Sequence, residues 1–344
     1  MHILVTGHTG FKGAWLLLLL TRLGHSVSGL ALDPLPGSLF ERAELSPFLL
    51  HDYRGDIRDA RIVQEAVSEA SPDILIHLAA QPLVRESYRN PTVTMETNVL
   101  GTLNLLEVAR RTSSLRAALV VTSDKVYRND SRSEGYVETD PLGGSDPYSA
   151  SKAMADILVQ SWTQSFNICP VAIARAGNVI GGGDAGQERL LPDLLTAFSK
   201  GRPAAIRSPE AVRPWQHVLD CLYGYVLLVD RLLSGDSGTV WNFGPETAST
   251  ASVSKVAERT ASLWGSEATW ETVASDSLHE AAVLTLNSSR SRDGLNWRDH
   301  LSLDAALEWT VTWTKEAKRI GNPLQVTQDQ IDEYLTQVQD TNRL

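Results

Sequence analysis

The sequence predicts an α/β fold built on a doubly wound parallel sheet, with a smaller mixed α/β lobe. In the first half, short β-branched or leucine-rich runs alternate with longer helical patterns, which is typical of crossover units with helices on both faces of a sheet. A glycine-rich turn joins the first predicted strand to the first predicted helix. Beyond residue 180, glycine and proline become frequent and short strand candidates separate the helices. This change of pattern indicates the second lobe.

The individual elements follow from hydrophobic periodicity. In the first half we predict strands at 2–6, 26–32, 49–54, 73–79, 117–122 and 170–174, and helices at 11–23, 59–70, 92–112 and 148–166. Later helices are predicted at 188–199, 218–233, 252–265 and 302–318. The chain then divides into a first domain of residues 1–178, to which part of 214–245 returns, a lobe of residues 179–325, and a polar, helical C-terminal tail of residues 326–344.

Composition limits the possible functions. The 344 residues are 42% hydrophobic and carry a net charge of -10, which predicts a soluble globular protein and argues against a nucleic-acid partner. The two cysteines, Cys169 and Cys221, lie far apart, and no Cys or His spacing is typical of a metal site, so we expect neither a disulfide framework nor a metal. No apolar run reaches the roughly 18 residues of a membrane span, and no signal peptide is recognised. We therefore expect a cytoplasmic protein.

The segment HILVTGHTGFKG predicts a dinucleotide site. Its glycines allow a tight turn, a close approach of the backbone to a diphosphate, and close packing of the following helix, whose amino end attracts negative charge. Asp33, about 20 residues later at the end of the second strand, can accept hydrogen bonds from both ribose hydroxyls and would repel a 2′-phosphate, which favours NAD over NADP. The residues expected around the cofactor are Gly7, Thr9, Gly10, Phe11, Gly13 and Asp33. Residues 1–178 are therefore predicted to be a Rossmann-like, NAD-binding domain.

The glycine spacing, the pair Asp56-Ile57 and the later YSASK together resemble the extended short-chain dehydrogenase/reductase family. The resemblance implies a nicotinamide cofactor across the sheet and a sugar nucleotide under the second lobe. Asp56 and Ile57 would lie near the adenine, although Asp56 could equally cap a helix. The segment HLAAQ resembles the family's turn after the fourth strand, which implies that Leu78, Ala79 and Ala80 contact the cofactor.

Tyr148 and Lys152 in PYSASKAMAD are four residues apart and therefore lie on one face of a helix. A phenol with a pKa near about 10 is a poor base, but a fixed ammonium beside it favours the phenolate. Tyr148 could then take the proton from a sugar hydroxyl, while Lys152 also holds the nicotinamide ribose. Ser123 would hydrogen-bond the same sugar oxygen. Taken alone, each of these residues could equally be a packing or surface residue.

Asp124 and Lys125, in VVTSDKVY, have no task in hydride transfer alone and could be an ordinary surface ion pair. They do have a task in a 4,6-dehydratase. A ketone at C4 of a hexose makes the C5 proton acidic, and loss of that proton can expel the C6 hydroxyl as water if an acid protonates it. Asp124 would be the acid and Lys125 the base. Hydride then returns to C6, so NAD is regenerated.

The sequence also resembles the branch of the family that dehydrates CDP-glucose. The matching segments are VTGHTGFKGAWL, HLAAQPLVRESY, TNVLGTLNLLE, VTSDKVY, DPLGGSDPYSASK, RAGNVIGGGD, RLLPD and IRSPEAVRPWQHVLD. The resemblance implies that Asn178 and Arg213 bind the substrate diphosphate and that Arg207 and Arg189 line the nucleotide. The same segments add three further substrate-binding residues, Gln81, Leu191 and His217. Arginine forks suit phosphate oxygens, although each arginine could also be a surface charge.

Two alternatives remain open. A nucleotide-sugar 4-epimerase would use the same fold, cofactor and Ser123, Tyr148 and Lys152. A dehydratase could also act on a different nucleotide hexose, since RNDSRSEGY after the Asp-Lys pair and Ala185-Gly186 depart from the family pattern. The family resemblance further implies a homodimer, with a tetramer possible, paired through the helices at 92–112 and 148–166. The apolar candidates for that interface, which could equally be core residues, are Leu100, Leu105, Ile157 and Leu158.

Overall fold

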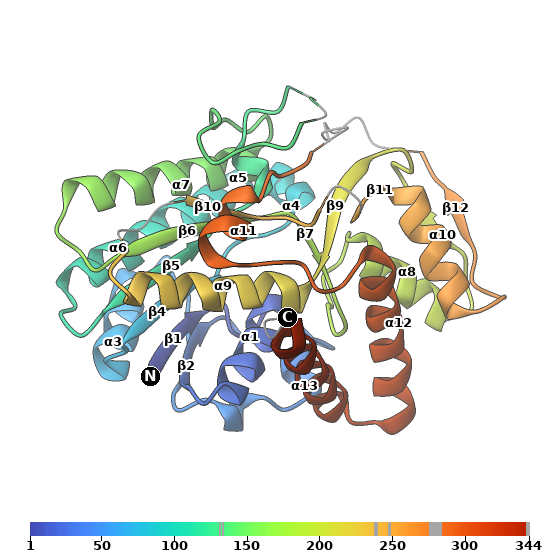
Figure 1. Cartoon of the computed structure of the whole chain (residues 1–344), viewed down its shortest axis with the longest axis horizontal. Helices are drawn as coiled ribbons and strands as arrows, with labels where there is room; N and C mark the ends of the chain where they lie inside the picture. The colour runs from blue at the N-terminus through green and yellow to red at the C-terminus, as the bar shows by residue number, and fades with distance from the viewer. Residues whose placement is uncertain (131, 133, 237–239, 247–248, 275–283, 342–344) are drawn as a thin grey trace.

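The computed structural model describes residues 1–344 except 131, 133, 237–239, 247–248, 275–283 and 342–344 (Figure 1). Within the described residues, seven parallel strands form the central sheet in the order β10-β6-β5-β4-β1-β2-β3. The strands are β1 (His2–Thr6), β2 (Ser26–Ala31), β3 (Asp52–Arg54), β4 (Ile74–His77), β5 (Ala117–Val121), β6 (Val171–Ala176) and β10 (Val240–Phe243). The order reverses between β1 and β4, which confirms the predicted doubly wound sheet.

Helices cover both faces of this sheet (Figure 1). One face carries α1 (Phe11–Arg22) and α9 (Val218–Leu233), and the other carries α3 (Ala60–Ala70), α6 (Gly101–Arg111) and α7 (Pro147–Ser165). The side chains of β5 alternate between the two cores. Leu119 and Val121 join the core under α1 and α9, while Ala118 and Val120 join the core under α6 and α7. Burial on both faces explains why these strands read as continuous apolar runs.

Some element boundaries differ from the prediction. The strand expected at 49–54 begins only at Asp52, because Ser46–Phe48 forms a short 3₁₀ turn that contains Pro47. The strand expected at 73–79 ends at His77. The helix expected at 92–112 consists of α5 (Pro91–Met95), a π-helical turn at Glu96–Leu100, and α6. A π turn adds one residue to a helical turn, which apolar periodicity alone does not reveal.

The second lobe combines small sheets and helices, as predicted for its fold class. A three-stranded sheet has the order β11-β9-β7, and β12 pairs with β8. These strands are β7 (Asn178–Ile180), β8 (Ala204–Ile206), β9 (Val212–His217), β11 (Thr250–Ser252) and β12 (Trp270–Thr272). The lobe's helices are α8 (Leu190–Ser199), α10 (Val253–Trp264) and α12 (Leu303–Ile320). Three shorter helices elsewhere are α2 (Leu39–Arg42), α4 (Val84–Arg89) and α11 (Ser289–Leu295). None of the described helices is long and apolar enough to cross a lipid bilayer.

The C-terminal helix α13 (Pro323–Thr341) packs against α1 and α12 (Figure 1). Its side chains Ile331, Tyr334 and Val338 are buried in the same core as α1. The Tyr334 hydroxyl also donates to Asp220 Oδ1 at 2.9 Å. The segment expected as a polar tail therefore contributes to the core, because its apolar residues fall on one face of the helix.

Candidate active site

The glycine-rich turn between β1 and α1 is shaped to receive a diphosphate. Gly7 has a left-handed backbone with φ 76°, and a Cβ there would lie 2.7 Å from the Ala79 nitrogen. A Cβ on Gly13 would lie 2.2 Å from the Gly7 carbonyl oxygen, so only glycine lets α1 pack this closely. Helix α1 follows Gly10 without a side-chain cap and without an acidic residue in its first turn. Its first amide groups therefore suit an anion.

Asp33 lies two residues beyond β2 and is exposed. In the described part of the chain its carboxylate has no hydrogen-bond partner. The Thr9 hydroxyl donates to the Leu32 carbonyl oxygen at 3.0 Å, which ties the glycine turn to this segment. A free carboxylate beside a diphosphate-shaped turn fits the ribose hydroxyls of a dinucleotide. Together, the turn and Asp33 fit NAD.

The side chains of the two residues expected near the adenine, Asp56 and Ile57, already make contacts within the protein. Asp56 pairs with Arg58 at 2.7 Å. It does not cap a helix, because the side chain that caps α3 is Asp59. The Ile57 side chain is buried against Gly101 of α6, so only the backbone of Ile57 can face a ligand.

The turn after β4 lies against the glycine turn. The Ala79 backbone nitrogen donates to Thr6 Oγ1 at 3.2 Å, and Leu78 and Ala80 flank it in the chain. His77 is a buried histidine whose ring nitrogens contact Thr6 Oγ1 at 2.7 Å and Thr102 Oγ1 at 3.1 Å. Burial lowers the pKa of His77 to about 3, so the ring is neutral. The turn is therefore held in place from within the core.

Gln81 closes the same turn. Its Nε2 donates to Thr94 Oγ1 at 2.8 Å and to the Leu83 carbonyl oxygen at 3.1 Å, and its backbone nitrogen donates to Asn98 Oδ1 at 2.8 Å. Asn98 lies in the π-helical turn and also donates to Ser151 Oγ at 2.8 Å. The π turn thus links the segment of Gln81 to the helix α7.

Ser123 and Asp124 follow β5 at the carboxyl edge of the sheet. Asp124 is buried, and it accepts a hydrogen bond from the Ser123 hydroxyl at Oδ1, at 3.0 Å. Its Oδ2 has no partner among the described residues, and a Cβ on Gly177 would lie 3.3 Å from it. Burial raises the pKa of Asp124, against the charge of the half-buried Lys125. A carboxyl group of raised pKa can keep a proton and donate it to a leaving group.

Tyr148 and Lys152 lie one turn apart near the start of α7, which is capped by Asp146. The Lys152 ammonium is buried and donates to the Val121 carbonyl oxygen at 3.1 Å. Burial lowers the pKa of Lys152 to about 8, and the charge of Lys12 acts in the same direction. Ser123, Asp124, Lys125, Tyr148 and Lys152 are the residues that the sequence predicts to be catalytic, and we refer to them by this prediction as the catalytic cluster. They meet at one edge of the sheet.

The electrostatics of Tyr148 differ from the expectation. Burial raises its pKa to about 12, and the groups that oppose this rise are the Ser123 hydroxyl and the charge of Arg189. The expected lowering by Lys152 is not found, because desolvation of the phenolate dominates and the ammonium is bonded to Val121.

Three expected substrate-binding residues converge on this cluster. The charge of the buried Arg213 acts on Asp124, and that of Arg189 acts on Tyr148. Asn178 opens β7 directly after the Gly177 that faces Asp124. Arg189 also pairs with Asp184 at 3.0 Å. These arginines bring positive charge to the place where a substrate diphosphate is expected.

The other expected substrate-binding residues lie elsewhere. The charge of Arg207 acts on Asp193 of α8. Leu191 is buried in the main core. His217 is fully buried, with its ring edge to face between Trp15 and Trp309, and its Nδ1 accepts from the Leu219 nitrogen at the start of α9. The structure therefore places the Leu191 and His217 side chains in the core.

Sequence reasoning missed two features near the cluster. Lys12 belongs to the glycine motif, but the motif predicts no role for its side chain. Its Nζ lies 3.3 Å from the Tyr225 hydroxyl of α9. Asp156, one turn beyond Lys152 on α7, forms a buried ion pair with Arg175 of β6 at 2.7 Å. A charged residue inside an apolar strand, as in VAIARA, was the available signal for this pair.

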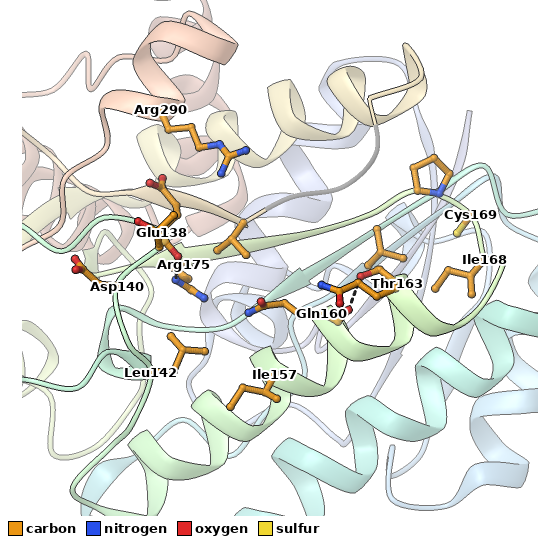
Figure 2. A pocket seen from close by; sticks show the side chains of 15 residues that line it. Glu138, Asp140, Leu142, Ile157, Gln160, Thr163, Ile168, Cys169, Arg175 and Arg290 are labelled. Carbon is orange, nitrogen blue, oxygen red and sulfur yellow. Dashed lines mark hydrogen bonds between the residues drawn. The ribbon is translucent and has the colours of Figure 1, made fainter.

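A groove of about 920 Å³ runs along α7 at the edge formed by β6 and β10 (Figure 2). Ile157, Gln160 and Thr163 of α7 line it, and Arg175 and Arg290 approach it from the other side. Of the described residues that line it, none belongs to the catalytic cluster. The groove is therefore separate from the candidate active site.

Among the described residues, no group of three or more His, Cys, Asp or Glu side chains could hold a metal ion.

Comparison with known proteins agrees with this geometry. The model of the NAD dependent epimerase/dehydratase family matches residues 3–244. A CDP-glucose 4,6-dehydratase from Salmonella typhimurium is 40% identical over 345 aligned positions, which cover 97% of this chain and 96% of that protein. The structure of dTDP-glucose 4,6-dehydratase from Bacillus anthracis with NAD superimposes with a TM-score of 0.80 at 22% identity, covering 93% of this chain and 98% of that one. The structure of UDP-glucose 4-epimerase from Thermotoga maritima with UDP-glucose superimposes with a TM-score of 0.81 at 22% identity. The superposition covers 92% of this chain and 100% of that one.

Proposed function

The chain belongs to the NAD dependent epimerase/dehydratase family, and from this premise we propose that it is a nucleotide-sugar 4,6-dehydratase that uses NAD. The proposed reaction converts CDP-glucose to CDP-4-keto-6-deoxyglucose. The observation that carries this proposal is the buried Asp124, whose Oδ2 has no partner among the described residues and whose pKa is raised. An epimerase needs no acid at this place. The choice of CDP-glucose is supported by the name and 40% identity of the Salmonella relative.

The cofactor would be held by residues of the first domain. The amide groups at the start of α1 would bind its diphosphate, and Asp33 its adenosine ribose. The turn at 78–80 would cover it, and Lys152 would bind the nicotinamide ribose. NAD bound there would supply a hydride acceptor for C4 of the sugar and, once reduced, the hydride donor for C6.

Oxidation at C4 requires removal of a proton from the C4 hydroxyl. We assign this to Tyr148, with the Ser123 hydroxyl bonded to the same sugar oxygen. The charge of Arg189 already opposes the raised pKa of Tyr148, and we expect the Lys152 ammonium to stabilise the phenolate further. The product of this step is the 4-ketone.

The elimination of water is then assigned to Asp124 and Lys125. Lys125 removes the proton at C5, which the ketone has made acidic, and Asp124 donates its proton to the C6 hydroxyl, which leaves as water. After hydride arrives at C6, the protonated Lys125 returns a proton to C5. Tyr148 releases to solvent the proton that it took from the C4 hydroxyl, and Asp124 takes one up from solvent. Each turnover therefore releases one water and leaves the protein unchanged.

The substrate diphosphate would lie between the two lobes. Arg213 and Asn178 would bind its oxygens, and Arg189 and Arg207 would line the nucleotide. Arg189 pairs with the carboxylate of Asp184 at 3.0 Å. In this proposal the bound nucleotide takes the place of that carboxylate as the partner of Arg189.

A substrate panel tests the proposal. Purified protein with added NAD is incubated separately with CDP-, dTDP-, GDP- and UDP-glucose, and the molecular masses of the products are measured by mass spectrometry. We expect CDP-glucose to lose one water first. An isomer of unchanged mass would favour the epimerase, and selective use of another nucleotide would overturn only the assignment of the base. Inertness of all four sugars would refute the proposed function.

A variant of Asp124 separates dehydratase from epimerase chemistry. Asp124→Asn keeps the size of the side chain but cannot donate the proton, so we expect dehydration to fall by about 10²–10⁴-fold. C4 oxidation survives, and C5 still exchanges with deuterium from heavy water. Asp329→Asn, which changes an exposed carboxylate on α13, should leave both measurements unchanged. A fully active D124N variant would contradict the assignment.

We further propose a cytoplasmic homodimer, with a tetramer as an extension of it. Both cysteines, Cys169 and Cys221, are free thiols, which fits a reducing compartment. Exposed apolar residues on adjacent helices support the dimer, since Leu100 closes the π-helical turn and Ile157 lies on α7. Of the other candidates, Leu105 is buried in the core and Leu158 is half-buried.

A further inference from the structure

An ion pair links helix α4 of the first domain to the segment between β7 and α8. Arg89 NH2 lies 2.6 Å from Glu188 Oε1 and NH1 lies 3.3 Å from Oε2, so two nitrogens hold one carboxylate. Arg89 also contacts Glu86 of its own helix at 3.4 Å. The Arg89 side chain is 56% exposed and that of Glu188 is 24% exposed. A pair as exposed as this adds little to the stability of a fold, so its location suggests another role.

Glu188 lies at a constrained point of the backbone. Its φ is 58°, in the left-handed region that residues with a side chain rarely adopt. The next residue, Arg189, is extended and flanks the start of α8. The Arg189 side chain packs over Gly186, where a Cβ would lie 3.0 Å from Arg189 Cδ. The backbone at Glu188 therefore determines where Arg189 points.

The other end of the link is attached to α7, the helix that carries Tyr148. Ser87 of α4 is buried, and its Oγ accepts a hydrogen bond from the Tyr148 nitrogen at 3.1 Å. The charge of Arg189 acts on Tyr148 as well. Both ends of the Arg89–Glu188 pair thus lead to the same place, and the pair fixes Arg189 relative to Tyr148.

We propose that the Arg89–Glu188 ion pair positions Arg189 toward the nucleotide of the substrate, whose phosphate oxygens suit an arginine fork. This inference rests on the proposed function, in which Arg189 lines the nucleotide. Without the pair, Glu188 can relax to an ordinary backbone conformation, and Arg189 moves with it. Arg89 and Glu188 are therefore positioning residues that act through Arg189 and do not touch the substrate themselves.

Binding of CDP tests the proposal, measured by isothermal titration calorimetry on the full-length protein with NAD. We expect Arg89→Met and Glu188→Gln each to weaken CDP binding about tenfold. The double variant should lose no more than either single variant, because both changes break one pair. In an Arg189→Met background, adding Arg89→Met should change CDP affinity by less than about twofold, because the residue through which the pair acts is already gone. Arg319→Met, which breaks an exposed pair with Glu316 within α12, should bind CDP as the wild type does.

Three results would overturn the proposal. Unchanged CDP affinity in both single variants would show that the pair positions nothing, and losses that add in the double variant would show that Arg89 and Glu188 act separately. A tenfold loss from Arg89→Met in the Arg189→Met background would show that Arg89 itself contacts the nucleotide. Thermal melting checks that each variant folds, and Arg89→Gln replaces Arg89→Met if that variant does not.

The titrations need no turnover, so they are independent of the substrate panel. If the panel favours another base, the diphosphate of that base replaces CDP. The expected pattern in a protein that dehydrates no sugar would refute the proposed function and leave this inference standing. A wild type that binds none of the four nucleoside diphosphates would overturn the inference, while the panel decides the proposed function separately.

Discussion

Arg175 and Asp156 form a bidentate ion pair behind the catalytic cluster, shielded from water. Arg175 Nε lies 2.8 Å from Oδ2 of Asp156 and NH2 lies 2.7 Å from Oδ1, and the two side chains are 1% and 0% exposed. Asp156 also accepts a hydrogen bond at 3.1 Å from Thr122, the residue before Ser123. Arg175 NH1 donates to the Tyr127 hydroxyl at 2.8 Å. The pair therefore joins β6 and α7 to the segment that carries Asp124.

Removing one partner of this pair should destabilise the fold strongly. Arg175→Met leaves the Asp156 carboxylate buried without its counter-charge, and we expect the free energy of unfolding to fall by about 3–5 kcal/mol. Urea unfolding at neutral pH measures it. The double variant Arg175→Met with Asp156→Leu should recover part of the loss, since no uncompensated charge remains. A double variant less stable than Arg175→Met would show that hydrogen bonds to Thr122 and Tyr127 matter more than charge compensation.

Lys152 should set an upper pH limit on activity. Its pKa is lowered to about 8, and the proposed mechanism needs its charged form. The ammonium is present below this pKa and lost above it, so kcat/KM should fall as the pH rises through about 8. Arginine stays charged throughout this range, so Lys152→Arg should move the falling limb to higher pH, even with lower activity at neutral pH. Profiles with the limb at the same pH in both proteins would assign it to another group.

The sheet, and the position of the predicted catalytic residues at its edge, could be predicted because their signals are local. Strand and helix patterns alternate within short windows, and Ser123 and Asp124 directly follow a strand whose end lies at the ligand-binding edge. Tyr148 and Lys152 meet on one helix face through their spacing alone. The predictions from these signals depended on no contact between distant parts of the chain.

Features that depend on distant contacts could not be predicted. Lys12 meets Tyr225, which is 213 residues away in sequence, so its orientation depends on where α9 packs. His217 was assigned to the substrate from its segment, yet Trp15 and Trp309 enclose it in the core. The pKa of Tyr148 depends on its burial and on the charge of Arg189, which spacing does not reveal.

Asp220 should make the fold less stable as the pH rises. Burial raises its pKa to about 7, although the His300 nitrogen and the Tyr334 hydroxyl both donate to its Oδ1. Between about pH 4 and 7 the folded protein keeps this proton and the unfolded chain loses it. The contribution of Asp220 to the free energy of unfolding is therefore full at low pH and is lost as the pH rises to about 7. The loss is at most about 4 kcal/mol in the free energy of unfolding.

Asp220→Asn tests this sign. The amide keeps an acceptor for both donors but cannot ionise, so its free energy of unfolding should lack this decline between about pH 4 and 7. Asp304→Asn, at an exposed carboxylate on α12, should follow the wild type. Parallel curves for wild type and D220N would show that the three donors, including the Leu301 nitrogen, keep Asp220 ionised in the fold.

Charges introduced at Leu100 and Ile157 should break the proposed dimer. The two side chains are 50% and 54% exposed and lie on adjacent helices. This is a large apolar exposure for a surface that faces solvent, and a second copy of the chain could cover it. The double variant Leu100→Glu with Ile157→Glu should elute as a monomer with the molar mass of one chain in light scattering, because a glutamate buried in an apolar interface lacks a partner. Leu50→Glu, at a site 59% exposed just before the edge strand β3, should stay dimeric. A dimer that survives both glutamates would place the interface away from Leu100 and Ile157.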